Sequence, residues 1–324
     1  MYNYVSLANS IVVNNGIATS RNTVTLVSRR NTSRCSFPEC RCKVKPVDGE
    51  RITTPSHVRG ITLCDTHMDM INGIDSFTYS HENTEHVGTR TKKGITTSFE
   101  LESVRNTTTS LASLVIDLGF DATHDCTLYP HGIEHKSRIF DSLQSATKTL
   151  GTIEHLNNIG AFDTHDEKCG AHIHTGLYDN VIDFTTIYES IDEYMDVFGG
   201  LYAYLDAMPN AKMLQYFGRG FVNYARVIRK DGNGYYMPEH NGKGKNLHHD
   251  ERIYTSDNIS DYHKCVFNLQ HTYSLEFRLP KFVNAEQYRK CIVAMQDVVA
   301  CLYDNDFHNC SDKLVDIFKK YFPY

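Results

Sequence analysis

Four short stretches of the sequence alternate ionisable with apolar residues, which is the pattern of a half-buried β-strand. They read TSFELES, PHGIEHK, AHIHT and SLEFRLP. Residues two apart in a strand share a face, so the ionisable side chains of each stretch gather on one side and the apolar ones on the other. The ionisable residues placed in this way are Glu100 with Glu102, Glu134, His172 with His174, and Glu276 with Arg278.

A sheet face dominated by glutamate and histidine repels itself unless cations fill it. Carboxylate oxygens with a few imidazoles suit Mg²⁺ or Mn²⁺ better than a dedicated zinc site. Divalent ions beside an arginine indicate the handling of nucleotide phosphates. For each strand taken singly, a solvated sheet face is the alternative, because antiparallel sheets commonly expose one side with polar residues two apart.

The order of SFELE, DATHDCTLYPHGIEHKS, CGAHIHTG and SLEFRLPKF resembles the amidoligases, carboxylate–amine ligases with a glutamine-synthetase-like fold. In that family a G-x-E-x-E strand opens the domain, a D-x-S…G-x-E segment follows, then C-G-x-H-x-H, and a late x-E-F-R strand closes the set. The resemblance spans roughly residues 94 to 300. Ser98 stands where the first motif usually has glycine.

The resemblance implies a set of metal ligands and phosphate contacts. Arg278 corresponds to a clamp on the phosphate or acyl phosphate, and Arg219, within YFGRGFVNYARV, to a second phosphate contact. His174 is implied as a further ligand, and either His174 or a nearby carboxylate is expected to be the base that deprotonates the amine. The implied ligands of Mg²⁺ or Mn²⁺ are Glu100, Glu102, Glu134, His172 and Glu276.

The activity implied by the resemblance is ATP-dependent ligation of a carboxylate to an amine through an acyl phosphate. Small-molecule or peptide carboxylates and amines are the expected substrates, with ATP and Mg²⁺ or Mn²⁺ as cofactors. A phosphotransferase on the same fold and a non-enzymatic, zinc-containing binding protein are the alternatives. A thiol hydrolase is a further alternative, with Cys169 as nucleophile and His172 as base.

A cysteine cluster near the N-terminus has the spacing of a zinc site. Cys35 and Cys40 form a Cys-x4-Cys pair, and Cys64 and His67 form a Cys-x2-His pair. Four such ligands complete the tetrahedral shell of a structural zinc ion. The stretch resembles small treble-clef zinc fingers, and Cys42 could replace Cys40 as a ligand. Unligated buried thiols are the alternative.

The composition excludes several classes of partner. The chain has 324 residues, 40% of them hydrophobic and 22% charged, and a net charge of −6, so a folded protein without a general attraction to nucleic acid is expected. We expect no membrane span, because no apolar run approaches about 18 residues. The N-terminal stretch lacks a basic leader, so a cytoplasmic location is expected. The zinc-finger-plus-ligase layout is associated with phage and mobile elements, and the oligomeric state stays open.

The periodicity predicts an α+β fold, with an antiparallel sheet covered by helices and a small zinc-binding segment at residues 35–67. The resemblance implies that the sheet is a glutamine-synthetase-like half-barrel. We expect an arm, the zinc segment and a linker over residues 1–93, and a catalytic domain over 94–324. Residues 237–252 read as a lid over the phosphates or as a hairpin extension after the Asp-Gly turn in RKDGNGYY. Helices are predicted at 137–150, 186–206, 285–304 and 311–322.

Overall fold

The structure is a computed structural model of the 324-residue chain. It groups the chain into two compact units, the first of residues 1–85, 100–138 and 148–169, and the second of residues 86–99, 139–147 and 170–324. The predicted catalytic domain is divided between the two units. The boundary predicted after residue 93 stays a prediction. The structure describes the backbone of eight short strands between residues 11 and 61, and residues 94–106, 114, 118–125, 128, 132–166, 168–177, 183–241, 245–254, 259, 262 and 264–324.

The N-terminal strands of the first unit pair antiparallel in four two-stranded ladders. All five predicted or alternative zinc ligands, Cys35, Cys40, Cys42, Cys64 and His67, lie outside the described residues. The ladders are β1 (Ile11–Asn14) with β2 (Ile17–Ser20), β3 (Thr25–Leu26) with β6 (Gly49–Glu50), β4 (Ser33–Arg34) with β5 (Lys43–Val44), and β7 (Ile52–Thr53) with β8 (Gly60–Ile61).

The predicted acidic strands are neighbours within the first unit. Strand β12 (Ile133–Lys136) pairs antiparallel with the second half of β9 (Ile95–Ser103) on one side and with β11 (Asp121–His124) on the other. Burial alternates along β9 as predicted, with Phe99 and Leu101 buried and Glu100 and Glu102 half-buried. A short ladder joins β10 (Arg105–Asn106) to β13 (Phe162–Asp163).

The second unit carries the other two predicted strands, also as antiparallel neighbours. Strand β19 (Leu275–Phe277) pairs with β14 (Ala171–Leu177) on one side and with β18 (Phe267–Asn268) on the other. The first half of β9 lies next to β14, where a Cβ added at Gly176 would come within 3.5 Å of Thr96 Oγ1. All four stretches that alternate in the sequence are therefore strands in the structure.

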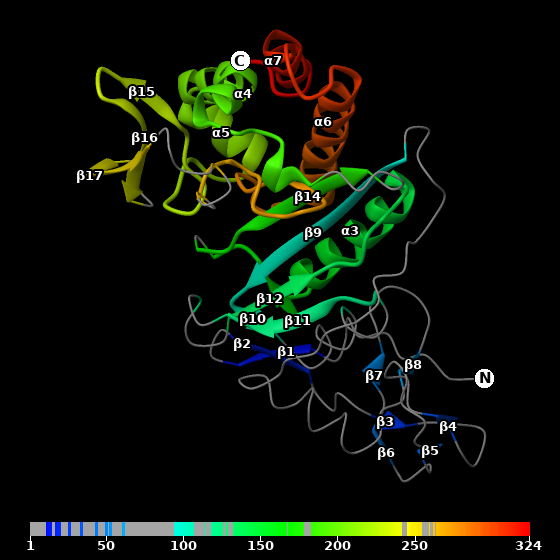
Figure 1. Cartoon of the computed structure of the whole chain (residues 1–324). Helices are drawn as coiled ribbons and strands as arrows, with labels where there is room; N and C mark the ends of the chain where they lie inside the picture. Colours follow the sequence, from blue (N-terminus) through cyan, green and yellow to red (C-terminus); the bar gives the residue numbers. More distant parts are fainter. Residues whose placement is uncertain are drawn as a thin grey trace. The chain divides into compact units, whose positions relative to one another are not determined.

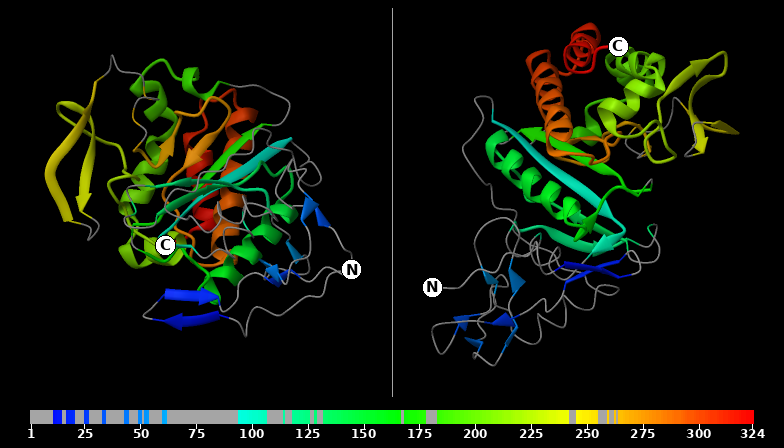
Figure 2. Two further views of the ribbon diagram at one scale, coloured as in Figure 1. Left: turned by 90° about the horizontal axis from the view of Figure 1, so that it is seen from below. Right: turned by 180° about the vertical axis from the view of Figure 1, so that it is seen from behind.

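Four helices of the second unit cover its strands (Figure 1; Figure 2). Helix α6 packs on β14, and α7 packs on both α4 and α6. Phenylalanine rings fill the interior, with Phe267 and Phe277 stacked at 5.3 Å and Phe318 edge-on to both. The helices are α4 (Ile191–Ala207), α5 (Asn210–Phe217), α6 (Ala285–Asp304) and α7 (Ser311–Tyr321), and a 3-10 turn, η4 (Phe184–Thr186), precedes α4.

The helix predicted at 285–304 is confirmed at both ends. Asn284 has an extended backbone, and its side chain accepts a hydrogen bond from the Gln287 backbone N–H, as expected of an N-cap. The helix predicted at 311–322 is confirmed to within one residue.

The helix predicted at 137–150 is wrong in its bounds, because α3 runs from Leu143 to Asn158. Phe140 instead forms an isolated antiparallel bridge with Thr97, with backbone hydrogen bonds of 2.7 and 2.8 Å. The Ser142 hydroxyl accepts a hydrogen bond from the Ser145 backbone N–H at 3.1 Å, as an N-cap does. The helix therefore begins after Ser142, later than the apolar pattern indicates.

The helix predicted at 186–206 begins five residues late, since Ser190 caps α4 by accepting from the Glu193 backbone N–H at 3.2 Å. Sequence analysis missed α5 entirely. Its eight residues follow Pro209 and end before Gly218, which adopts a left-handed conformation with φ of 74°.

Residues 237–241 and 245–252 lie in two paired strands, which agrees with the hairpin, one of the two predicted alternatives. Strand β15 (Arg229–Asp231) turns into β16 (Gly234–Asn241), which pairs antiparallel with β17 (Lys245–Ile253). Its action as a lid stays a prediction.

The observed mixture of helices with antiparallel strands agrees with the predicted α+β class. Within the described part of the chain, no helix combines the length and the apolar character needed to cross a bilayer.

Candidate functional site

A fully buried carboxylate, Glu276, lies at the centre of a polar cluster in the second unit. Its Oε1 is 3.0 Å from His172 Nδ1 and accepts a hydrogen bond from Arg278 Nη1 at 2.7 Å. Its Oε2 accepts from Asn268 Nδ2 at 2.6 Å and lies 3.2 Å from His271 Nε2. Each carboxylate oxygen therefore has two side-chain partners, which a buried charge needs if it is to be stable.

The carboxyl group of Glu276 stays ionised despite its burial. Removal from water raises its pKa, but hydrogen bonds from His172 and His271 and the charges of His172 and Arg278 outweigh this and hold the pKa well below its usual range. The cluster therefore contains a fixed negative charge at the centre of cationic and amide groups.

Strand register brings the two predicted pairs together. His174 on β14 and Glu276 on β19 are Cα partners, and so are Ile173 and Phe277. Because side chains alternate across a strand, His174 and Glu276 emerge on one face while Ile173 and Phe277 enter the core. The predicted same-face arrangement is thus confirmed for this pair.

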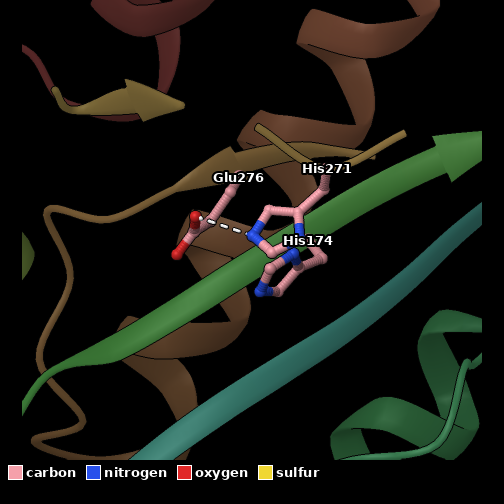
Figure 3. Close-up of side chains that lie close together, drawn as sticks. All are labelled: His174, His271 and Glu276. Atoms are coloured by element: carbon pink, nitrogen blue, oxygen red, sulfur yellow. Dashed lines mark hydrogen bonds and ion pairs between the residues drawn. The ribbon is translucent and has the colours of Figure 1, made fainter. Parts of the chain in front are cut away.

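His271 approaches the same face from the loop between β18 and β19 (Figure 3). Its ring stands nearly perpendicular to that of His174, with centroids 4.6 Å apart. Ser274 Oγ lies 3.3 Å from His174 Nδ1. Ligand atoms of His174, His271 and Glu276 all lie within 4.8 Å of one another, so these residues could hold a metal ion.

Hydrogen bonds beneath the cluster fix the amide of Asn268. Its Oδ1 accepts from the Gln270 backbone N–H at 3.0 Å, which directs Nδ2 towards Glu276. Below it, the Tyr194 hydroxyl donates to the Phe267 carbonyl at 2.7 Å, and the Phe267 N–H donates to Tyr202 at 3.4 Å. Since the one proton of Tyr194 is used in this way, Tyr202 donates the 2.7 Å hydrogen bond between the two tyrosines.

The acidic strands of the first unit form a second, more open cluster. Glu102 and Glu134 are Cα partners across β9 and β12, as are Glu100 and Lys136. The Lys136 ammonium lies 3.3 Å from Glu100 and 3.6 Å from Glu134, and its own side chain is 48% exposed. Although burial lowers the pKa of Lys136, the charges of Glu100 and Glu134 outweigh it and raise that pKa.

Arg219 has a role that the sequence did not indicate. Its guanidinium is buried and donates to the Leu279 carbonyl at 2.9 Å and to the Arg278 carbonyl at 2.6 Å. These bonds hold the backbone directly after β19, which carries Arg278. Arg219 therefore anchors this backbone, and its contact with a phosphate stays a prediction.

Arg278 is held at two of its nitrogens, by Glu276 at Nη1 and by the Tyr224 carbonyl at Nε, 2.9 Å away.

Cys169, the nucleophile of the thiol-hydrolase alternative, is completely buried. Reactive thiols occupy partially exposed, electropositive surroundings, so the position of Cys169 disfavours this alternative.

Sequence analysis missed His271 and Asn268. His271 lies in a loop, where no alternation marks the direction of a side chain. Asn268 begins the stretch NLQHTYSLEF, and only its spacing of eight residues from Glu276 hinted at a hairpin partner.

Comparisons of the chain with protein-family models, with curated proteins and with solved structures found no match.

Proposed function

We propose that the chain is an ATP-dependent carboxylate–amine ligase that requires Mg²⁺ or Mn²⁺ and proceeds through an acyl phosphate. One observation carries the proposal: the stretches that resemble the amidoligase motifs are strand neighbours in register. Glu134 is the partner of Glu102, and Glu276 is the partner of His174. If the four short motifs had occurred by chance over nearly two hundred residues, such pairing would not be expected.

The side-chain chemistry of the acidic strands suits a hard divalent cation. Glu100, Glu102 and Glu134 offer carboxylate oxygens, the ligands that Mg²⁺ and Mn²⁺ prefer. An ammonium group, that of Lys136, already lies between two of these carboxylates, so the position attracts positive charge. When bound, the divalent ions would neutralise the triphosphate of ATP.

The side chains of the second unit would supply orientation and proton transfer. Arg278, held by Glu276 and by the Tyr224 carbonyl, presents a preoriented guanidinium for the oxygens of the transferred phosphoryl group. His174, or a nearby carboxylate when His174 is engaged as a metal ligand, would accept the proton that the amine loses as it attacks the acyl phosphate. Arg219 would keep Arg278 in place through the two backbone carbonyls that it binds.

In the proposed ligase, the zinc ion of the N-terminal cysteines has only a structural role. Cys35, Cys64 and His67, with Cys40 or Cys42, would hold it and take no part in the reaction. Serine at Cys35 or Cys64 is expected to lower the zinc content by one ion per chain, and an unchanged zinc content would contradict this part.

Nucleotide binding tests the proposal without knowledge of the substrates. We expect the wild-type chain to bind ATP in the presence of Mn²⁺ by calorimetry, and Glu102→Gln and Glu134→Gln to weaken that binding. Glu189→Gln is the matched control, because Glu189 is exposed and lies outside both clusters. Absence of ATP binding by the wild-type chain at every Mn²⁺ concentration would overturn the proposal.

Trapping separates ligase from phosphotransferase. Hydroxylamine converts an acyl phosphate into a hydroxamate, so a panel of carboxylates with ATP, Mn²⁺ and hydroxylamine should yield hydroxamate together with ADP. Arg278→Lys should lower the rate, since an ammonium cannot replace a planar, bidentate donor. Transfer of phosphate to a hydroxyl group, with no hydroxamate from any carboxylate, would favour a phosphotransferase.

A further inference from the structure

We propose that His174, His271 and Glu276 form a binding site for a divalent transition-metal ion, of the class of Zn²⁺ and Co²⁺, which discriminates against Mg²⁺. Their ligand atoms lie within 4.8 Å of one another in the second unit (Figure 3). The ligands of a tetrahedral ion, at about 2.1 Å from the metal, are about 3.4 Å apart. Small shifts of the His271 loop would therefore complete the site.

The two oxygens of Glu276 have separate roles in this geometry. Oε1 faces His172 and Arg278, which hold the carboxylate in place and neutralise its charge. Oε2 faces His271, 3.2 Å away, and would become the metal ligand once an ion replaces that hydrogen bond. Asn268 Nδ2 donates to the same oxygen and keeps its direction when the ion binds.

Supporting hydrogen bonds of the kind found around metal ligands are already present. The Ser274 hydroxyl lies 3.3 Å from His174 Nδ1, which leaves Nε2 as the nitrogen directed at the metal. The Gln270 backbone N–H fixes Asn268, which in turn fixes Glu276. Gln270 and Ser274 come from the segment between β18 and β19, which also carries His271.

The donor set determines the class of ion. Two imidazoles and one carboxylate are the ligands of many zinc sites that keep an open position. Mg²⁺ prefers oxygen ligands and gives up its water reluctantly, so it would bind weakly here. The site thus differs in chemistry from the acidic strands, although Glu276 also enters the proposed ligase function.

Metal binding alone tests the site. The full-length chain is stripped with a chelator and titrated with Zn²⁺ by calorimetry, with metal content measured after dialysis. We expect His271→Ala to bind one ion fewer per chain than the wild type, or to bind it at least about tenfold more weakly. Ions held by the N-terminal cysteines cancel in this difference. Mg²⁺ in large excess should not displace the ion.

Matched variants keep the test decisive. His155→Ala removes an exposed imidazole from α3 and should bind as the wild type does. His174→Ala should repeat the loss seen with His271→Ala, and thermal unfolding confirms that each variant is folded. Equal stoichiometry and affinity in the wild type and in folded His271→Ala would overturn the site. Because no nucleotide is present, that result is independent of the ligase proposal, which would fail by absence of ATP binding.

Discussion

The two ionisable clusters hold their carboxylates in opposite ways. On β9 and β12, Glu100, Glu102 and Glu134 are half-buried, and the Lys136 ammonium lies beside two of them, Glu100 and Glu134. Around Glu276, a single buried carboxylate has four side-chain partners that are cations, imidazoles or an amide. We therefore expect the first cluster to gain from an added cation, whereas the second tolerates loss of a partner poorly and takes an ion only in exchange for the hydrogen bond from His271.

The largest expected effect is on stability at Glu276. Glu276→Ala leaves Arg278, His172 and Asn268 without their buried acceptor and should lower the free energy of unfolding by about 3–5 kcal/mol. Urea unfolding measures this loss. Glu102→Ala, on the half-exposed acidic face, should cost less than about 1 kcal/mol. Equal costs at the two positions would remove the distinction between the clusters.

The next effect on stability is expected from the buried histidine of β12. His135 on β12 lies in the core against Phe162, and burial lowers its pKa to about 3, whereas the pKa of an unfolded histidine is about 6.5. Between these values the unfolded chain binds the extra proton. The free energy of unfolding therefore falls as the pH drops below 6.5, by about 2–3 kcal/mol at pH 4.5.

His135→Phe should remove that part of the pH dependence. Urea unfolding at pH 7 and 4.5 measures it as a difference from the wild type, which cancels the contribution of the carboxylates. His155→Gln, at an exposed position, should retain the wild-type slope. The same slope in His135→Phe and in the wild type would show that His135 is not held neutral.

A smaller effect is expected from the hydroxyl beside His174. Ser274→Ala removes a contact of 3.3 Å at Nδ1 but no ligand, so the affinity for Zn²⁺ should fall by about tenfold while the stoichiometry stays unchanged. Calorimetry distinguishes this from His271→Ala, which removes a ligand. A full loss of the ion in Ser274→Ala would mean that the hydroxyl itself coordinates it.

The smallest effect is a gain. Lys136→Ala frees Glu100 and Glu134 from their ammonium partner, so the acidic cluster should bind Mn²⁺ about threefold to tenfold more tightly, which corresponds to an exposed ion pair of about 1 kcal/mol. Electron paramagnetic resonance of free Mn²⁺ measures the change. Weaker binding in this variant would show that Lys136 orients the carboxylates for the ion instead of competing with it.

Local alternation was sufficient to predict the strands and the faces of their side chains. Phe99 and Leu101 enter the core and Glu100 does not, because a period of two fixes the faces whatever the partner strand. The start of α6 was equally predictable, since Asn284 caps it through its own side chain.

Features set by contacts distant in the sequence were not predictable. Phe140 fits the apolar pattern of a helix, yet it forms a bridge with Thr97, more than forty residues earlier. His271 reaches Glu276 only because a loop turns back on β19. In the same way, the spacing of YFGRGF gave no sign that Arg219 binds the Leu279 and Arg278 carbonyls.

Two tyrosines of helix α4, Tyr194 and Tyr202, bind the backbone next to the Glu276 cluster and keep their protons at high pH. Burial raises the pKa values of both Tyr194 and Tyr202 well above normal, so their hydroxyl protons persist wherever the protein remains folded. The backbone at Phe267 is consequently anchored from a helix that contributes no ligand to the site. Tyr194→Phe would therefore change the metal affinity from the opposite side of the sheet, through the loss of this anchor.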